Sequence, residues 1–283
     1  MTQRSRGRSA KFSSTIRLLV ALIVTAIFSI PLYLAFVNVF KNNDQILIDP
    51  AALPAPFTLG NLISVLTSPN SDFWAHLLNS FAIAVPSMLG TVMLGSMLGY
   101  YLARSTGAAP RILQVLLLMG LMLPFQVLLL PLSIILRTFG LQGTLAGLIL
   151  FNIAFYVPFA AFVYSRFVKT VPFELEEAAE IDGAGRLRIF LQIVAPLLRP
   201  TTASVMIFVG VWVWNDFINP LVLLGSGNGA TVTTGIYFAI GQFNTDFGTM
   251  FALTILAAAP ILIFFFILQD RFIAGLASGA TKG

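Results

Sequence analysis

The sequence predicts an all-α fold: a polytopic membrane helical bundle of six transmembrane helices, with both termini in the cytoplasm. The first observation is composition, because 58% of the residues are hydrophobic, only 10% are charged, and the mean hydropathy is +0.92. The second is a set of six apolar runs, each long enough to cross a hydrocarbon core, which takes about 20 residues of helix. The third is the one-sided distribution of lysine and arginine.

The six predicted spans are separated by polar or proline-containing segments. They cover residues 16–39, 77–103, 112–136, 143–167, 201–224 and 251–272. Every run contains a proline; these are Pro31, Pro86, Pro124, Pro131, Pro158, Pro220 and Pro260. In a membrane bundle, neighbouring helices and local backbone adjustments satisfy the carbonyls that proline leaves free, so kinked but continuous helices are expected.

The basic side chains orient the bundle. With cytoplasmic termini, only Lys41 and Arg137 of the 16 lysines and arginines lie outside. The remainder lie inside: Arg4, Arg6, Arg8, Lys11, Arg17, Arg104, Arg111, Arg166, Lys169, Arg186, Arg188, Arg199, Arg271 and Lys282. Such a bias is typical of membrane topology and requires an even number of spans. The basic pI near 9.8 therefore does not indicate nucleic-acid binding.

Four segments follow from this topology. We expect a basic cytoplasmic tail (1–15), a first span with a long outside loop (16–76), a five-helix core (77–272) containing a cytoplasmic loop (171–200), and a cytoplasmic tail (273–283). The first apolar run exceeds the 7 to 15 residues or so of a signal-peptide core, so we expect it to remain as a span. The chain has no cysteine, which excludes disulfides and thiolate metal sites.

The loop 171–200 carries most of the charge in the second half of the chain. Its first part reads as a helix with a patch of four acids, Glu174, Glu176, Glu177 and Glu180. Gly183 is a plausible terminator, since glycine takes a positive φ without a steric penalty. A second amphipathic helix follows, with one expected apolar face of Leu187, Phe190, Leu191 and Val194. These patterns alone favour a solvated loop whose amphipathic half lies on the membrane surface.

The spacing within this loop resembles a known family. "EEAA" at 176–179, "DGA" at 182–184, Phe190 and Pro196 resemble the EAA motif of bacterial ATP-binding-cassette (ABC) importer permeases. Ala195 departs from the leucine that is usual before the proline, which blurs only the subfamily. Further segments resemble the smaller permease of maltose-type carbohydrate importers; these are "NSFAIAV" from Asn79, "GYYLAR" ending at Arg104, "GLQGTLAGLIL" from Gly140, "WNDF" from Trp214 and "GLASGATKG" from Gly275.

The resemblance implies that the cytoplasmic loop is a coupling helix docking into an ATPase, with Glu177 pairing with a basic residue there. The implied coupling residues are Glu176, Glu177, Ala178, Ala179, Asp182, Gly183, Ala184, Phe190 and Pro196. The implied partners are a homologous second permease, two ABC ATPase subunits that bind ATP and Mg, and an extracytoplasmic solute-binding protein. The implied substrate is a carbohydrate, and the implied location is the bacterial cytoplasmic (inner) membrane.

Motifs for chemistry are missing from the sequence. It contains neither a G-x-x-x-x-G-K-[ST] phosphate loop nor an H-E-x-x-H metal motif, and its single histidine is His76. We therefore expect no catalytic residue, no metal and no cofactor within this chain, and we expect a transport subunit rather than an enzyme. The alternative is an ion- or proton-coupled secondary transporter, for which Asp216 is the only carboxylate expected at membrane depth.

Polar groups at membrane depth are the candidates for a solute path, because each costs free energy there and tends to mark a cavity. Amides and aromatic rings also suit sugar hydroxyls and ring faces. The candidates are Gln126, Asn152, Tyr156, Asn215, Asp216 and Asn219. The competing interpretation is that these amides bond across helices and that Trp212 and Trp214 mark the membrane interface.

Overall fold

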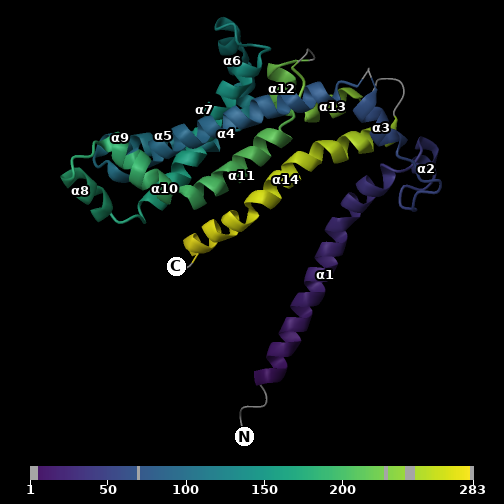
Figure 1. Cartoon of the computed structure of the whole chain (residues 1–283), viewed down its shortest axis with the longest axis horizontal. Helices are drawn as coiled ribbons and strands as arrows, with labels where there is room; N and C mark the ends of the chain where they lie inside the picture. Colours follow the sequence, from purple (N-terminus) through teal and green to yellow (C-terminus); the bar gives the residue numbers. More distant parts are fainter. Residues whose placement is uncertain (1–5, 69–70, 226–228, 240–245, 281–283) are drawn as a thin grey trace. The chain divides into compact units, whose positions relative to one another are not determined.

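The computed structural model describes residues 6–68, 71–225, 229–239 and 246–280, with side chains described between 16 and 269. These described residues form helices and connecting turns, with no strand among them (Figure 1). The predicted all-α class is therefore confirmed. Four helices are long and apolar enough to cross a membrane, and the number rises to six if each of two bent helix pairs counts as one span.

The chain divides into two compact units. One comprises Met1–Ser71 with Ala239–Leu256, and the other comprises Asp72–Phe238 with Ala257–Gly283. The division falls inside the last helix, α14 (Phe247–Ala280), so each unit contains part of it.

The first unit contains α1 (Arg6–Asn38), α2 (Asn43–Ile48) and α3 (Gly60–Thr67). No residue in the most apolar window of α1 is buried within the described chain. A helix with apolar side chains facing outward all round needs lipid or another chain around it. The predicted outside loop is ordered by polar bonds: Asn61 Nδ2 donates to the carbonyls of Val39 and Lys41, at 2.7 and 2.9 Å.

The second unit is built on the pairing of α4 (Phe73–Arg104) with α7 (Leu145–Val168). Small residues bring the two backbones close. A Cβ added at Gly95 would lie 2.5 Å from Ala160 Cβ, and one at Gly99 would lie 2.6 Å from Tyr164 Cβ. The glycines of the second apolar run are thus used for helix packing, as small residues in membrane bundles usually are.

The third predicted span is not one continuous helix. It consists of α5 (Ala108–Met122) and α6 (Phe125–Thr138), which are bent by 104°. Leu123 is extended and Pro124 caps α6, because proline lacks an N–H and disfavours a helical conformation in the residue before it. The expected kink at Pro124 is therefore a break.

The fifth predicted span also differs. Its helix α11 (Arg199–Asn215) ends at Asp216, whose backbone is extended, and the short α12 (Ile218–Leu223) follows. Pro220 thus lies in α12 instead of kinking a longer helix. The other five prolines, namely Pro31, Pro86, Pro131, Pro158 and Pro260, lie inside continuous helices as expected. The segment between α12 and α14 contains α13 (Val232–Ala239).

Candidate functional site

The loop between α7 and α11 forms the predicted helix, turn and helix. The first helix is α8 (Glu174–Ile181), and the second begins with α9 (Arg186–Ile189), then runs through a π-helical turn (Phe190–Val194) into α10 (Ala195–Leu197). Within the second unit, α8 and α9 lie at the end opposite α12 and α13 (Figure 1). The described helices here bend by 77° before α11 continues.

A glycine turn ends α8. Gly183 has a φ of +80°, its N–H donates to Glu180 O at 3.0 Å, and the N–H of Ala184 donates to Ala179 O at 2.9 Å. This pair of bonds is a Schellman motif, which needs a left-handed residue at the position of Gly183. The predicted terminator is confirmed.

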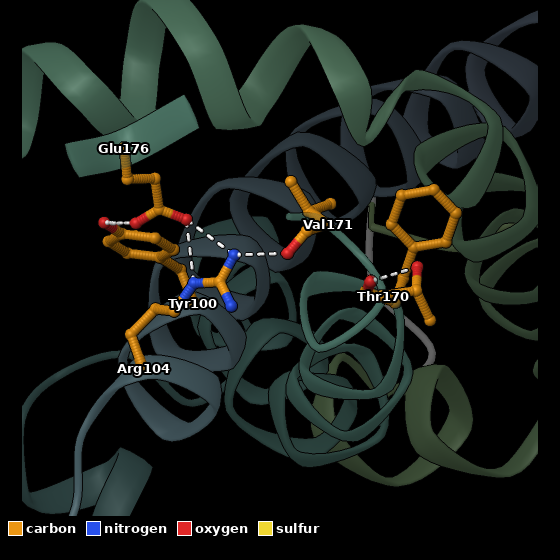
Figure 2. Close-up of polar contacts among 6 residues, drawn as sticks. Tyr100, Arg104, Thr170, Val171 and Glu176 are labelled. Carbon is orange, nitrogen blue, oxygen red and sulfur yellow. Dashed lines mark hydrogen bonds and ion pairs between the residues drawn. The ribbon is translucent and has the colours of Figure 1, made fainter. Parts of the chain in front are cut away.

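The inner side of α8 is anchored to the C-terminal end of α4 (Figure 2). Glu176 Oε2 accepts from the Tyr100 hydroxyl at 2.7 Å, and Oε1 accepts from Arg104 Nε at 2.7 Å. The Nη2 of Arg104 lies 2.7 Å from the same Oε1 and donates to Val171 O at 2.9 Å. Glu176 is 4% exposed, so this carboxylate points into the chain.

The predicted patch of four exposed acids is therefore wrong at Glu176. Glu174, Glu177 and Glu180 are exposed, whereas Glu176 is buried beside a cation. A buried carboxylate is tolerated only when it is paired and hydrogen-bonded, and Tyr100 and Arg104 supply both conditions.

The outer side of the loop is mixed in character. Glu177 and Ala178 are exposed, Ala179 is partly buried, and Ile181 is 86% exposed. Asp182 and Pro196 are exposed as well, and Ala184 is partly buried. Exposed apolar side chains beside carboxylates, on a loop this polar, suit a protein partner with a basic and apolar groove.

The second helix does not present one apolar face. Phe190 and Val194 are buried, whereas Leu187 and Leu191 are exposed. Phe190 packs on Tyr100 with ring centroids 5.4 Å apart, so it supports the anchor of α8 from within. The π-helical turn adds one residue to a helical turn and so changes which side chains face inward.

Two of the solute-path candidates, Asn152 and Tyr156, lie on α7. Asn152 is 1% exposed and donates to Ser87 Oγ at 3.3 Å across the α4–α7 contact. Tyr156 is partly buried and stacks on Trp212 at 5.5 Å.

Asp216 lies at the end of α11, close enough to Tyr156 to interact with it electrostatically. Asp216 accepts from the backbone N–H and the Nδ2 of Asn219, at 3.2 and 2.7 Å, and Thr233 donates to the Asp216 carbonyl at 2.7 Å. Asn219 is buried. Gln126 and Asn215 are exposed, and Asn215 Nδ2 donates to Val211 O at 2.9 Å.

Sequence reasoning did not identify Tyr100 and Arg104 as partners of this loop. A usable signal existed, because a tyrosine and an arginine four residues apart share one face of a helix at the end of an apolar run. That pattern indicates a polar pair at the C-terminal end of the helix, but it does not indicate which acidic residue binds to the pair.

Comparison with known proteins agrees with this architecture. Residues 92–278 match the family described as the binding-protein-dependent transport system inner membrane component. The chain is 33% identical to the diacetylchitobiose uptake system permease protein NgcG of Streptomyces coelicolor, over 98% of this chain and 90% of that protein. It is 34% identical to the multiple sugar-binding transport system permease protein MsmG of Streptococcus mutans, over 89% and 91%.

The fold has a counterpart among solved structures. A bacterial ABC transporter involved in the import of the acidic polysaccharide alginate superposes with a TM-score of 0.81, covering 94% of this chain and 98% of that one, at 17% identity. At this identity the likeness concerns the fold.

Proposed function

The chain belongs to the family of binding-protein-dependent transport system inner membrane components, and on that premise we propose that it is the membrane-spanning permease subunit of an ATP-driven ABC importer for a carbohydrate. The family match covers about two-thirds of the chain, and the similarity to NgcG covers 98% of it. The proposed location is the bacterial cytoplasmic membrane, with both termini in the cytoplasm.

One observation carries the proposal for how transport is driven: the rigid elbow of α8, Gly183 and α9. Its Schellman turn fixes the angle between two short helices, and its outer side leaves Glu177, Ala178 and Ile181 exposed. We propose that this surface docks on an ABC ATPase. ATP can drive a permease only if the closed ATPase dimer favours one conformation of the permease over the other. A rigid elbow is able to transmit this preference of the ATPase dimer to the membrane helices of the permease.

The proposed assembly contains this chain, a homologous second permease, two ATPase subunits and an extracytoplasmic solute-binding protein. The family description itself refers to a binding protein. ATP and Mg would bind to the ATPase subunits. The proposed coupling residues are Glu176, Glu177, Ala178, Ala179, Asp182, Gly183, Ala184, Phe190 and Pro196.

A carbohydrate substrate is supported by the relatives, whose names specify diacetylchitobiose uptake and multiple sugar transport. We propose that solute-path groups come from the set Gln126, Asn152, Tyr156, Asn215, Asp216 and Asn219. In the described conformation, Gln126, Asn215 and the Tyr156–Trp212 stack are more accessible than Asn152 and Asn219. Aromatic faces and amides are suitable partners for the ring faces and hydroxyls of sugars.

Reconstitution tests the proposal. The chain would be co-expressed with the permease, ATPase and binding protein encoded beside it, purified, and placed in liposomes. We expect uptake of radiolabelled oligosaccharides, diacetylchitobiose among them, that needs both ATP on the ATPase side and the binding protein on the other. Uptake by liposomes holding this chain alone under a proton or sodium gradient would contradict the proposal and favour secondary transport.

A further inference from the structure

We propose that Tyr100, Arg104 and Glu176 form an internal latch that makes α8 move together with α4 and α7. This inference rests on the proposed function, and it changes the role of Glu176: the residue positions the coupling helix instead of docking on the ATPase. The latch is defined as these three side chains and the Val171 carbonyl (Figure 2).

The bonds of the Glu176 side chain are directed toward α4. Among the residues that the structure describes, the Glu176 carboxylate bonds to α4, with Tyr100 on one oxygen and Arg104 on the other. Arg104 also holds the chain just before α8, through its bond to Val171 O and through the Phe173 ring, 5.4 Å from its guanidinium carbon. A guanidinium is able to make these contacts at once because its donors form a fixed planar fork.

The residues of the latch are largely buried. Glu176 and Val171 are buried, and the side chain of Arg104 is 16% exposed, so water does not readily replace the bonds of the latch. Removing one partner of a buried ion pair leaves an uncompensated charge and is strongly destabilising locally. We therefore expect the Glu176–Arg104 pair to be either fully formed or fully broken, unlike a surface ion pair that forms and breaks readily.

The two helices next to α8, α4 and α7, are tightly packed against each other. The contacts at Gly95 and Gly99 show that α4 and α7 touch backbone to backbone, with Ala161 O only 2.8 Å from a Cβ added at Gly99. The linker from α7 to α8 is short and bonded, since Val171 N–H donates to Val168 O at 3.1 Å. Because α8 is tied to α7 by the chain and to α4 by the latch, a force on α8 displaces α4 and α7 with it.

The test uses the absence of cysteine in the sequence. Spin labels would be attached to Tyr101→Cys on α4 and Ile181→Cys on α8, both exposed positions, in the full chain in nanodiscs. The distance distribution between the labels would be measured by double electron–electron resonance. We expect a narrow distribution that becomes about twofold broader with Glu176→Ala, because α8 then loses its own side-chain bonds to α4 and is held only by its linker and by the turn to α9.

Glu180→Ala is the matched control, since it removes the same charge from an exposed site on the same helix. It should leave the distribution narrow. Tyr100→Phe removes a single hydrogen bond and should broaden the distribution less than Glu176→Ala does, which keeps the test usable if the alanine variant inserts poorly. Equal distributions in the parent, Glu176→Ala and Tyr100→Phe would overturn the latch.

A second measurement separates positioning from docking. In the reconstituted complex, Glu176→Ala should still bind the ATPase but transport several-fold fewer solute molecules per ATP hydrolysed. Loss of ATPase binding, equal to that of Glu177→Ala, would overturn the positioning role. The label distances require no ATPase, so they test the latch even if the chain proves to be driven by another energy source.

Discussion

At the scale of single residues, Gly183 is under the strictest conformational demand in the loop 171–200. Its φ of +80° lies in the left-handed region, yet an added Cβ would meet nothing within 4 Å. The restriction is thus one of backbone conformation and not of space. Gly185, two residues later, has a φ of −71° and equally open surroundings, so any L residue fits there.

Gly183→Val should therefore disrupt the elbow, since a left-handed conformation costs an L residue about 1–2 kcal/mol and a β-branched one more. We expect about a tenfold loss of ATP-driven uptake in reconstituted liposomes at an unchanged amount of inserted protein. Gly185→Val is the control and should retain uptake. An equal loss of uptake in the two variants would show that uptake depends on side-chain bulk at this surface and does not depend on the left-handed turn.

At the scale of elements, the α4–α7 contact is the most extensive described helix pair, and Gly99 lies in its half nearer to α8. A methyl group at Gly99 would lie 2.6 Å from Tyr164 Cβ and 2.8 Å from Ala161 O, so the two backbones would have to move apart. Gly120 in α5 offers a control, because a Cβ there meets nothing within 4 Å.

Gly99→Ala should lower the apparent Tm of the detergent-solubilised chain, since overpacking costs about 1–3 kcal/mol. The measurement is the fraction of monodisperse protein left after heating, followed by size-exclusion chromatography. Gly120→Ala should keep or slightly raise the Tm, because alanine is favoured over glycine in a helix by up to about 1 kcal/mol. A Tm for Gly99→Ala equal to that of the parent would indicate that α4 and α7 separate easily, and it would contradict the inference that both helices move together with α8.

The elements that sequence predicts well are those determined locally. The apolar runs predict α4 and α7, and the residues around Gly183 predict the turn, because length, hydropathy and backbone freedom are properties of a short window. Two features depend on distant residues and were not predicted. The burial of Glu176 depends on Arg104, 72 positions away, and the outcome at Pro124, a break instead of a kink, depends on what packs around α5 and α6.

At the scale of the whole molecule, the second unit separates two kinds of polar group. The coupling elbow lies at one end, and the bonded group of Asp216, Asn219 and Thr233 belongs to the end formed by α12 and α13 (Figure 1). The helices between these ends are apolar and contain buried small and aromatic residues. The described side-chain bonds between these helices are few, such as Asn152 to Ser87 and Tyr164 to Thr202. We therefore expect movement at the elbow to be transmitted along α4, α7 and α11 mainly as rigid-body displacement of packed helices.

The distribution of lysine and arginine predicts the orientation of the chain in the membrane. Fourteen of the 16 lysines and arginines fall on the side of the elbow if both termini are cytoplasmic, and such a bias orients membrane proteins. Ile48 on α2 and Ile181 on α8 make a matched pair of reporters, as they are 84% and 86% exposed and no cysteine competes. In intact cells, a membrane-impermeant maleimide should label Ile48→Cys and spare Ile181→Cys, while permeabilised cells should label both to a similar extent. Labelling of Ile181→Cys in intact cells would place the elbow on the external face, where no ATPase is able to reach it, and the docking proposal would be contradicted.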